Sequence, residues 1–219
     1  MSLTATGLKF RYPSGPLLLD GLDLEVASGC SAVVMAPSGV GKSTLLAVLG
    51  GLRRPESGTV TIARDGADVN HGVEQTESAT MISWVFQAMH LLPQRTALEN
   101  VAVAAMPRGL RRSQAEQLAA IELERFTVGE LARRQVRTLS GGQCQRVALA
   151  RASVADPCVV FADEPTANLD PANAAAVARV LVTGFPRAAV VIATHDPDVA
   201  AMADVAYRLD GGRLVPVPR

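Results

Sequence analysis

The sequence has no long hydrophobic run. Its most continuous apolar stretches, such as residues 45–52 and 188–193, are far shorter than the ~20 residues that a membrane-spanning helix needs. Residues 1–10 also lack the apolar core and the small-residue cleavage site of a signal peptide. We therefore expect a cytosolic protein that does not cross a membrane by itself.

The chain also lacks an excess of charge, and it has few cysteines. Lys plus Arg and Asp plus Glu both total 21, so no net field favours nucleic acid or an anionic membrane surface, and we expect no nucleic-acid partner. The three cysteines, Cys30, Cys144 and Cys158, are odd in number and fit no metal-ligand spacing. Reduced, partly buried thiols are the simplest interpretation.

Short apolar runs alternate with helical patterns along the chain. Residues 31–36 predict a strand, and the apolar spacing over residues 45–49 predicts a helix that ends at Gly50-Gly51. Further buried strands are expected at residues 59–63, 82–86, 158–162, 188–194 and 205–209. This alternation predicts an α/β fold with a largely parallel core sheet, and 219 residues fit one domain.

Residues 91–150 have a different, helical periodicity. Two capping-box patterns, Thr96 to Glu99 and Ser113 to Glu116, are each expected to open a helix there. We interpret this stretch as a mostly helical lobe.

The segment Ala36-Pro-Ser-Gly-Val-Gly-Lys-Ser-Thr44 follows a predicted strand and opens a predicted helix. In that context it is a phosphate-binding loop: its glycines let backbone N–H groups surround phosphate oxygens, Lys42 reaches the β- and γ-phosphates, and Ser43 can bind Mg²⁺. The expected nucleotide-binding residues here are Ser38, Gly39, Val40, Gly41, Lys42, Ser43 and Thr44. Ala36 stands where the motif has its first glycine, which is tolerable only if its φ is negative.

A second motif, Leu139-Ser-Gly-Gly-Gln143, gives the class of the protein. Together with Cys144-Gln-Arg-Val-Ala-Leu-Ala-Arg151 it resembles the signature motif of the ABC (ATP-binding cassette) ATPase family. Its hydroxyl and free N–H groups at a helix start form a second anion site, for which we expect Ser140, Gly141, Gly142 and Gln143 to contact a γ-phosphate. The pentapeptide alone would fit an ordinary N-cap. A thiol near a helix start can gain thiolate character, and on that ground we hypothesise that Cys144 is sensitive to oxidation.

Two acids end the apolar run before Asp163-Glu164. Carboxylates beside a buried strand are costly unless a cation or a proton transfer uses them. The family resemblance implies that Asp163 helps to hold Mg²⁺ and that Glu164 is the general base for the attacking water.

The resemblance assigns four more residues. Gln87 is implied to contact Mg²⁺ and the attacking water, and His195 to contact the γ-phosphate. Asp170 matches a loop that passes between two active sites, although a helix N-cap before Pro171 explains it equally well, and both roles can hold together. Tyr12 is implied to stack on adenine; an ordinary core or surface tyrosine is the alternative.

The family resemblance covers residues 12 to about 214. It implies a P-loop NTPase (RecA-like) core with an N-terminal antiparallel β subdomain and an inserted α-helical subdomain. We expect one ABC ATPase domain, with residues 1–87 and 156–219 as the catalytic lobe and residues 88–155 as the helical lobe. It further implies ATP and Mg²⁺ as ligands, a head-to-tail dimer with a second copy, and a separate transmembrane permease that holds the protein on the cytoplasmic face of the membrane.

The segments at residues 91–101 and 163–170 look most like the group that serves lipoprotein extraction, macrolide or peptide efflux, haem efflux and cell division. We therefore favour an exporter of hydrophobic or amphipathic cargo. A cassette that regulates a membrane partner without transport, and the ATPase of an importer, remain open. DNA-repair and translation cassettes are disfavoured, because the chain has neither a long coiled coil nor a second cassette.

Overall fold

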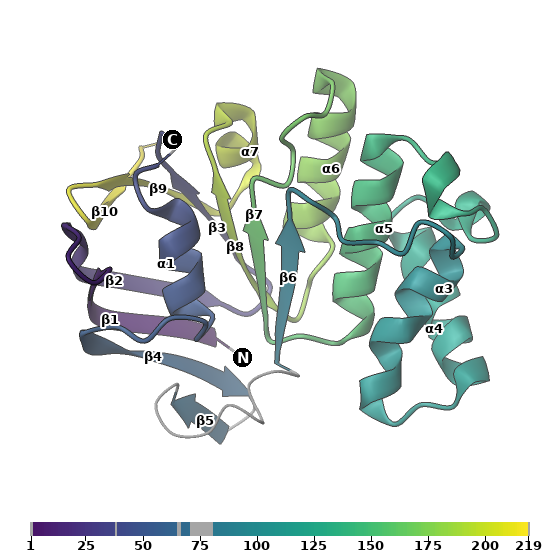
Figure 1. Ribbon diagram of the computed structural model, residues 1–219, viewed down its shortest axis with the longest axis horizontal. Helices are drawn as coiled ribbons and strands as arrows, with labels where there is room; N and C mark the ends of the chain where they lie inside the picture. Colours follow the sequence, from purple (N-terminus) through teal and green to yellow (C-terminus); the bar gives the residue numbers. More distant parts are fainter. Residues whose placement is uncertain (1, 38, 65–66, 71–80, 219) are drawn as a thin grey trace.

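The computed structural model describes residues 2–37, 39–64, 67–70 and 81–218, and its strands form two sheets (Figure 1). The antiparallel sheet, in the order β2-β1-β4-β5, comprises β1 (Ser2–Arg11), β2 (Leu17–Ala27), β4 (Ser57–Arg64) and β5 (Ala67–Asn70). The second sheet, in the order β10-β9-β3-β8-β7-β6, comprises β3 (Ser31–Met35), β6 (Ile82–Phe86), β7 (Val159–Asp163), β8 (Ala189–Thr194), β9 (Val205–Asp210) and β10 (Arg213–Pro216).

The second sheet is parallel except at one edge. Neighbouring strands from β9 through β3, β8 and β7 to β6 all pair in parallel, whereas β10 pairs antiparallel with β9. Its central strands are covered on both faces, which explains why β8 is an unbroken run of buried apolar residues rather than an alternating one. The predicted parallel core sheet is confirmed.

Helix α1 (Lys42–Leu49) lies between the two sheets (Figure 1). Its buried leucines and valine belong to one apolar cluster with side chains of the antiparallel sheet, such as Leu3 and Leu8, and of the parallel sheet, such as Val34 and Val191. The helix that follows the glycine-rich loop is therefore fixed from both sides.

The remaining helices cover the other face and the right-hand end of the sheet (Figure 1). They are α3 (Ala97–Ala102), the 3₁₀-helix η1 (Val103–Arg108), α4 (Arg112–Arg125), α5 (Gly141–Val154), α6 (Pro171–Thr183) and α7 (Pro197–Met202), with short 3₁₀ turns at Gly129–Leu131 and Val136–Thr138. A second apolar cluster joins them to the sheet and contains Phe126, Leu149 and Leu181. None of the helices in the described ranges has the length and hydropathy to cross a bilayer.

One of the two expected helix starts is confirmed. Thr96 forms a reciprocal capping box with Glu99 at the start of α3. The prediction for Ser113 is wrong, because α4 begins at Arg112 and Ser113 lies inside its first turn. Gln114 accepts a hydrogen bond from the Arg111 N–H at 3.0 Å, so a glutamine one residue after Ser113 performs the capping expected of Glu116.

Helices α3, α4 and α5 follow one another between β6 and β7. This is the inserted helical subdomain of the expected fold. The division of the chain at residues 87/88 and 155/156 stays a prediction.

The position of α1 between two sheets makes a testable prediction for stability. Leu49 is fully buried, so Leu49→Ala should lower the free energy of unfolding by about 2–5 kcal/mol, since the cavity would lie between both sheets. Chemical denaturation of the purified protein measures this. Leu52→Ala is the matched control: Leu52 follows the same helix but is 61% exposed, and its loss should change stability by less than about 0.5 kcal/mol. Equal losses in the two variants would contradict the packing described.

Candidate nucleotide-binding site

The sheet topology collects the predicted site residues at one edge. Strands β3, β8, β7 and β6 are parallel neighbours in that order, so the segments that follow their carboxyl ends lie side by side. Lys42 follows β3, His195 follows β8, Glu164 follows β7 and Gln87 follows β6. Residues separated by more than a hundred positions in the chain thereby reach one place, as is usual for ligand sites of open α/β sheets.

The glycine-rich loop has the backbone conformation that its sequence predicts. Gly39 and Gly41 have φ values of +84° and +110°, which favour glycine strongly. Ala36 is not among the described non-glycine residues with positive φ, so the alanine is compatible with this loop. Ser38 lies outside the described residues.

Lys42 is the buried charge at the centre of the site. Its side chain is 5% exposed, and its ammonium donates to the Ala36 carbonyl at 2.6 Å and to the Pro37 carbonyl at 3.3 Å. It also forms an ion pair with a Glu164 carboxylate oxygen at 3.2 Å. A buried ammonium needs such partners, because an unpaired charge would pay the full cost of leaving water.

Glu164 links Lys42 to His195. Its carboxylate lies 3.1 Å from His195 Nδ1 and accepts a hydrogen bond from the Thr194 hydroxyl at 3.2 Å. Its backbone has a φ of +47°, a conformation that is strained for a residue with a side chain and is often found at functional sites. The Glu164 N–H donates to the Ala193 carbonyl at 2.8 Å, which ties this conformation to β8.

Burial and hydrogen bonding act in opposite directions on Glu164. Burial raises the pKa of its carboxyl, but the hydrogen bonds and charges of His195 and Lys42 outweigh burial and hold the pKa below its usual value. The residue is therefore ionised at neutral pH, as a proton acceptor must be.

Asp163 supplies a feature that favours a cation. Its Oδ1 atom is buried and has no hydrogen-bond partner within the described part of the chain. Ser43 and Gln87 are exposed side chains with oxygen ligands, and oxygen ligands are what Mg²⁺ prefers. The described residues contain no group of three or more His, Cys, Asp and Glu side chains arranged for a metal. These residues fit a Mg²⁺ ion that takes part of its coordination from phosphate oxygens.

The Ser140 to Gln143 segment forms the start of α5. The Ser140 side chain accepts a hydrogen bond from the Gln143 N–H at 3.3 Å, and Gln143 Oε1 accepts one from the Ser140 N–H at 2.9 Å. Ser140 and Gly141 are exposed there. Helices α1 and α5 belong to different apolar clusters, on opposite faces of the parallel sheet, and in Figure 1 the strands β8, β7 and β6 stand between them, so the two predicted anion sites of one chain lie apart.

Asp170 is the N-cap of α6. Its carboxylate accepts hydrogen bonds from the backbone N–H and side-chain Nδ2 of Asn173 at 3.0 and 2.6 Å, and these bonds lower its pKa. The capping role is confirmed. The role between two active sites stays a prediction.

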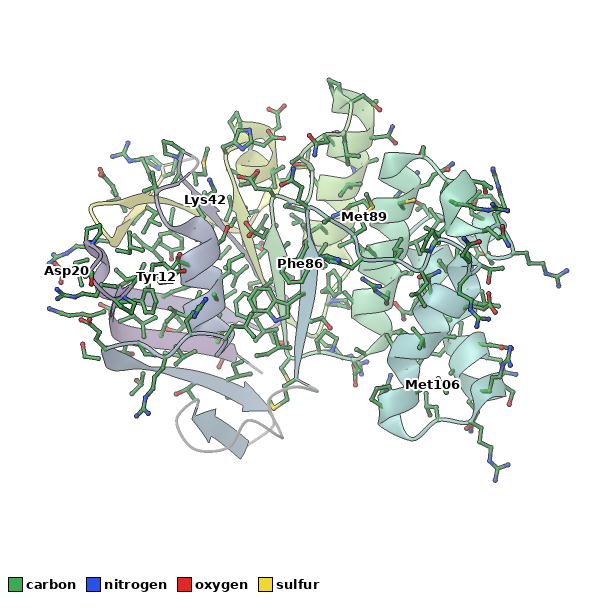
Figure 2. The ribbon with its side chains drawn as sticks, viewed as in Figure 1. Tyr12, Asp20, Lys42, Phe86, Met89 and Met106 are labelled. Atoms are coloured by element: carbon green, nitrogen blue, oxygen red, sulfur yellow. The ribbon has the colours of Figure 1, made fainter. Side chains whose placement is uncertain are left out.

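Tyr12 follows β1 and is 38% exposed, so it is not a core residue. Its hydroxyl is hydrogen-bonded to the Thr44 hydroxyl of α1 at 3.2 Å, which places the ring beside the glycine-rich loop. Figure 2 labels Tyr12 on the side of α1 that faces the antiparallel sheet, and Lys42 at the beginning of that helix.

Two residues near the site were missed by the sequence reasoning. Thr194 bonds Glu164, and Arg151 donates from α5 to the carbonyls of Met89 and His90, both at 2.7 Å. Arg151 therefore ties the segment after Gln87 to α5. The sequence shows a hydroxyl at the end of a strand (Thr194) and an arginine late in a helix (Arg151). Neither feature indicates which distant residue the side chain contacts.

The expected thiolate character of Cys144 is wrong. The residue is half-buried, its thiol lies 3.6 Å from the Val136 carbonyl, and burial raises the pKa of the thiol.

Comparison with known proteins identifies the family. The family model described as ABC transporter matches residues 19–167. The lipoprotein-releasing system ATP-binding protein LolD of Chromohalobacter salexigens is 40% identical over 218 residues, which cover 97% of this chain and 92% of that protein.

Two solved structures share the fold. The cbiO1 protein of Clostridium perfringens, described as part of the ABC transporter complex cbiONQ, matches with a TM-score of 0.86 and 27% identity, over 97% of this chain and 86% of that one. The ATP-binding cassette MJ0796, in a dimeric post-hydrolysis state bound to ADP and Pi, matches with a TM-score of 0.79 and 29% identity, over 97% and 96% of the two chains. The chain therefore belongs to the ABC transporter family and is an ATPase of the ATP-binding cassette type.

Proposed function

We propose that this ATPase binds Mg²⁺-ATP between two of its copies and uses hydrolysis to drive a separate membrane permease that exports lipid-anchored or similarly amphipathic cargo. The observation that carries the catalytic part is the connected group of Lys42, Glu164 and His195 at the end of the glycine-rich loop. A buried cation, an ionised carboxylate and an exposed imidazole are the groups that binding and hydrolysing a triphosphate needs.

The loop and helix supply the phosphate site. Backbone N–H groups at residues 39–44 and the N-terminus of α1 attract phosphate oxygens. The Lys42 ammonium attracts the negatively charged oxygens of the β- and γ-phosphates. Ser43, Gln87 and Asp163 would hold Mg²⁺, which neutralises phosphate charge when it is bound.

Phosphate binding changes the partners of Lys42. Its ammonium is shared between the Ala36 carbonyl and Glu164, and a γ-phosphate competes for the same ammonium. Once Lys42 turns to the phosphate, the Glu164 carboxylate keeps His195 and Thr194 as partners and has an oxygen for the attacking water. Glu164 is then the general base, and His195 is the group that senses the γ-phosphate.

The separation of the two anion sites supports a composite pocket. The segment from Ser140 to Gln143 begins α5, which packs on the opposite face of the parallel sheet from α1 and its first residue, Lys42. In a head-to-tail dimer each copy can place this segment over the nucleotide held by the other, and a two-fold axis makes both pockets equal. The dimeric cassette MJ0796 is a structural precedent for such a pair.

An exposed apolar pair offers a surface for the permease. Leu92 and Val103 are 50% and 46% exposed. Both are near Asn100: its buried side chain exchanges hydrogen bonds with the Leu92 backbone at 2.7 and 3.0 Å, and Val103 is the C-cap of α3, three residues after Asn100. We propose that the permease binds here, beside the segment after Gln87. The same segment would then contact both the nucleotide site and the membrane partner. This contact keeps the chain on the cytoplasmic face of the membrane.

The cargo proposal depends on sequence similarity. A relative named for a lipoprotein-releasing system is 40% identical along nearly the whole chain. In this proposal the permease binds the cargo, whereas the ATPase has no cargo site and contributes to specificity only by binding that permease.

The first prediction concerns the general base. Glu164→Gln keeps the shape of the side chain but removes its charge, so steady-state ATP hydrolysis should fall by about 10²- to 10⁴-fold while ATP still binds and holds the two copies together. Phosphate-release assays and size-exclusion chromatography with ATP measure both. Lys42→Ala should instead lose ATP binding, and Glu130→Gln, an exposed acid, is the control. Near-normal turnover in Glu164→Gln would remove Glu164 from the mechanism.

The second prediction concerns the docking surface. Val103→Glu should greatly reduce co-purification with the permease, because it places a charge in an apolar contact. Ile121→Glu, a change at a more exposed apolar residue of α4 (61% exposed), should not. Equal recovery of the permease with both variants would place the contact elsewhere.

The third prediction concerns the cargo. The permease captured with this ATPase, reconstituted in proteoliposomes, should release an acylated lipoprotein only with ATP, and the same lipoprotein without its acyl chains should not stimulate hydrolysis. Uptake dependent on a binding protein, or ATP-dependent signalling without release of any cargo, would instead identify an importer or a regulatory cassette.

A further inference from the structure

Arg53 contacts the ring of Tyr12. Its guanidinium carbon lies over the ring, 5.6 Å from the ring centroid. This is within the distance at which a cation is attracted to the face of an aromatic ring. Both side chains are exposed, so the contact is at the surface, beside the proposed nucleotide site.

The turn after α1 brings Arg53 to this position. Gly50 has no room for a side chain, because an added Cβ would collide with the Trp84 ring, and Gly51 has a φ of +72° that favours glycine. The Arg53 N–H then donates to the Ala47 carbonyl at 3.0 Å, which fixes the backbone of Arg53 to the helix of the glycine-rich loop.

Other contacts restrict the Tyr12 ring. Phe10 packs against it edge to face, with ring centroids 5.1 Å apart and an interplanar angle of 86°. The Tyr12 hydroxyl is bonded to Thr44, and the Gly15 N–H donates to the Tyr12 carbonyl at 2.8 Å. Arg53 lies over the ring and the residue is still 38% exposed, so part of Tyr12 remains accessible to a ligand.

We infer that Arg53 is a positioning residue for the purine base of the nucleotide, acting through the Tyr12 ring. The guanidinium holds the ring in one orientation and draws electron density from it, and the base stacks on the opposite face. A planar guanidinium suits this role better than an ammonium, because it can lie parallel to the ring. The inference rests on the adenine-stacking role proposed for Tyr12.

A simpler role for Arg53 would be a positive charge that attracts the phosphates at a distance. The chain offers a matched control for that role. Arg54 carries the same charge one residue along, is also exposed, and within the described residues has no aromatic ring beneath its guanidinium. A charge effect should be similar for both arginines and independent of the base.

The test compares two ligands of the intact protein, the slowly hydrolysed ATP analogue AMP-PNP and inorganic tripolyphosphate, which has no base. Arg53→Ala should weaken AMP-PNP binding about two- to fivefold, the effect of an exposed cation–π contact, and leave tripolyphosphate binding unchanged. Arg54→Ala should not change the ratio of the two affinities. Arg53→Lys should weaken AMP-PNP binding less than Arg53→Ala does. In a Tyr12→Leu background, Arg53→Ala should cause no further loss.

Three results would overturn the inference: equal weakening of both ligands by Arg53→Ala, equal effects of Arg53→Ala and Arg54→Ala, or the same loss with and without Tyr12. Failure of the proposed function gives a different result. A wild-type protein that binds neither ligand would contradict the nucleotide site itself, and one that binds both equally well would contradict the role of Tyr12.

Discussion

The site depends on one buried charge, the ammonium of Lys42. It is held by a carbonyl of its own loop and by Glu164 from a strand that lies two positions away in the sheet. Since a buried cation must have anionic or carbonyl partners, its position also fixes the end of β7 and, through Glu164, the end of β8. A triphosphate is an anion that can replace part of this set of partners, so in the proposed mechanism its binding would reach Glu164 through Lys42.

The fold keeps this charge in place from two directions. The helix that begins at Lys42 is packed between an antiparallel and a parallel sheet, in an apolar cluster separate from the one beneath the helical lobe. The helical end of the molecule is joined to the parallel sheet by the second apolar cluster, and Arg151 ties the segment after Gln87 to α5.

The fold and the chemistry could be predicted wherever the signal is local. Gly39, Gly41 and Lys42 are close in sequence, and the buried strands are continuous apolar runs, so the loop and the parallel sheet were foreseen. Contacts between distant segments were not: Thr194 with Glu164, Arg151 with Met89 and Arg53 with Tyr12 each join residues that no pattern relates. The Ser113 and Cys144 predictions failed for a similar reason, because a competing neighbour or burial overrode the local preference.

Glycine at position 142 has a consequence for the dimer. A Cβ there would come within 2.5 Å of the Asn173 side chain, and Asn173 in turn holds the Asp170 cap. The start of α5, which a copy would lend to its neighbour in the proposed dimer, therefore packs against the start of α6, the helix that follows Glu164 in its own chain. If two copies share their pockets as proposed, this contact would link the two pockets, because a shift of α6 in one copy would move the segment that this copy lends to its neighbour.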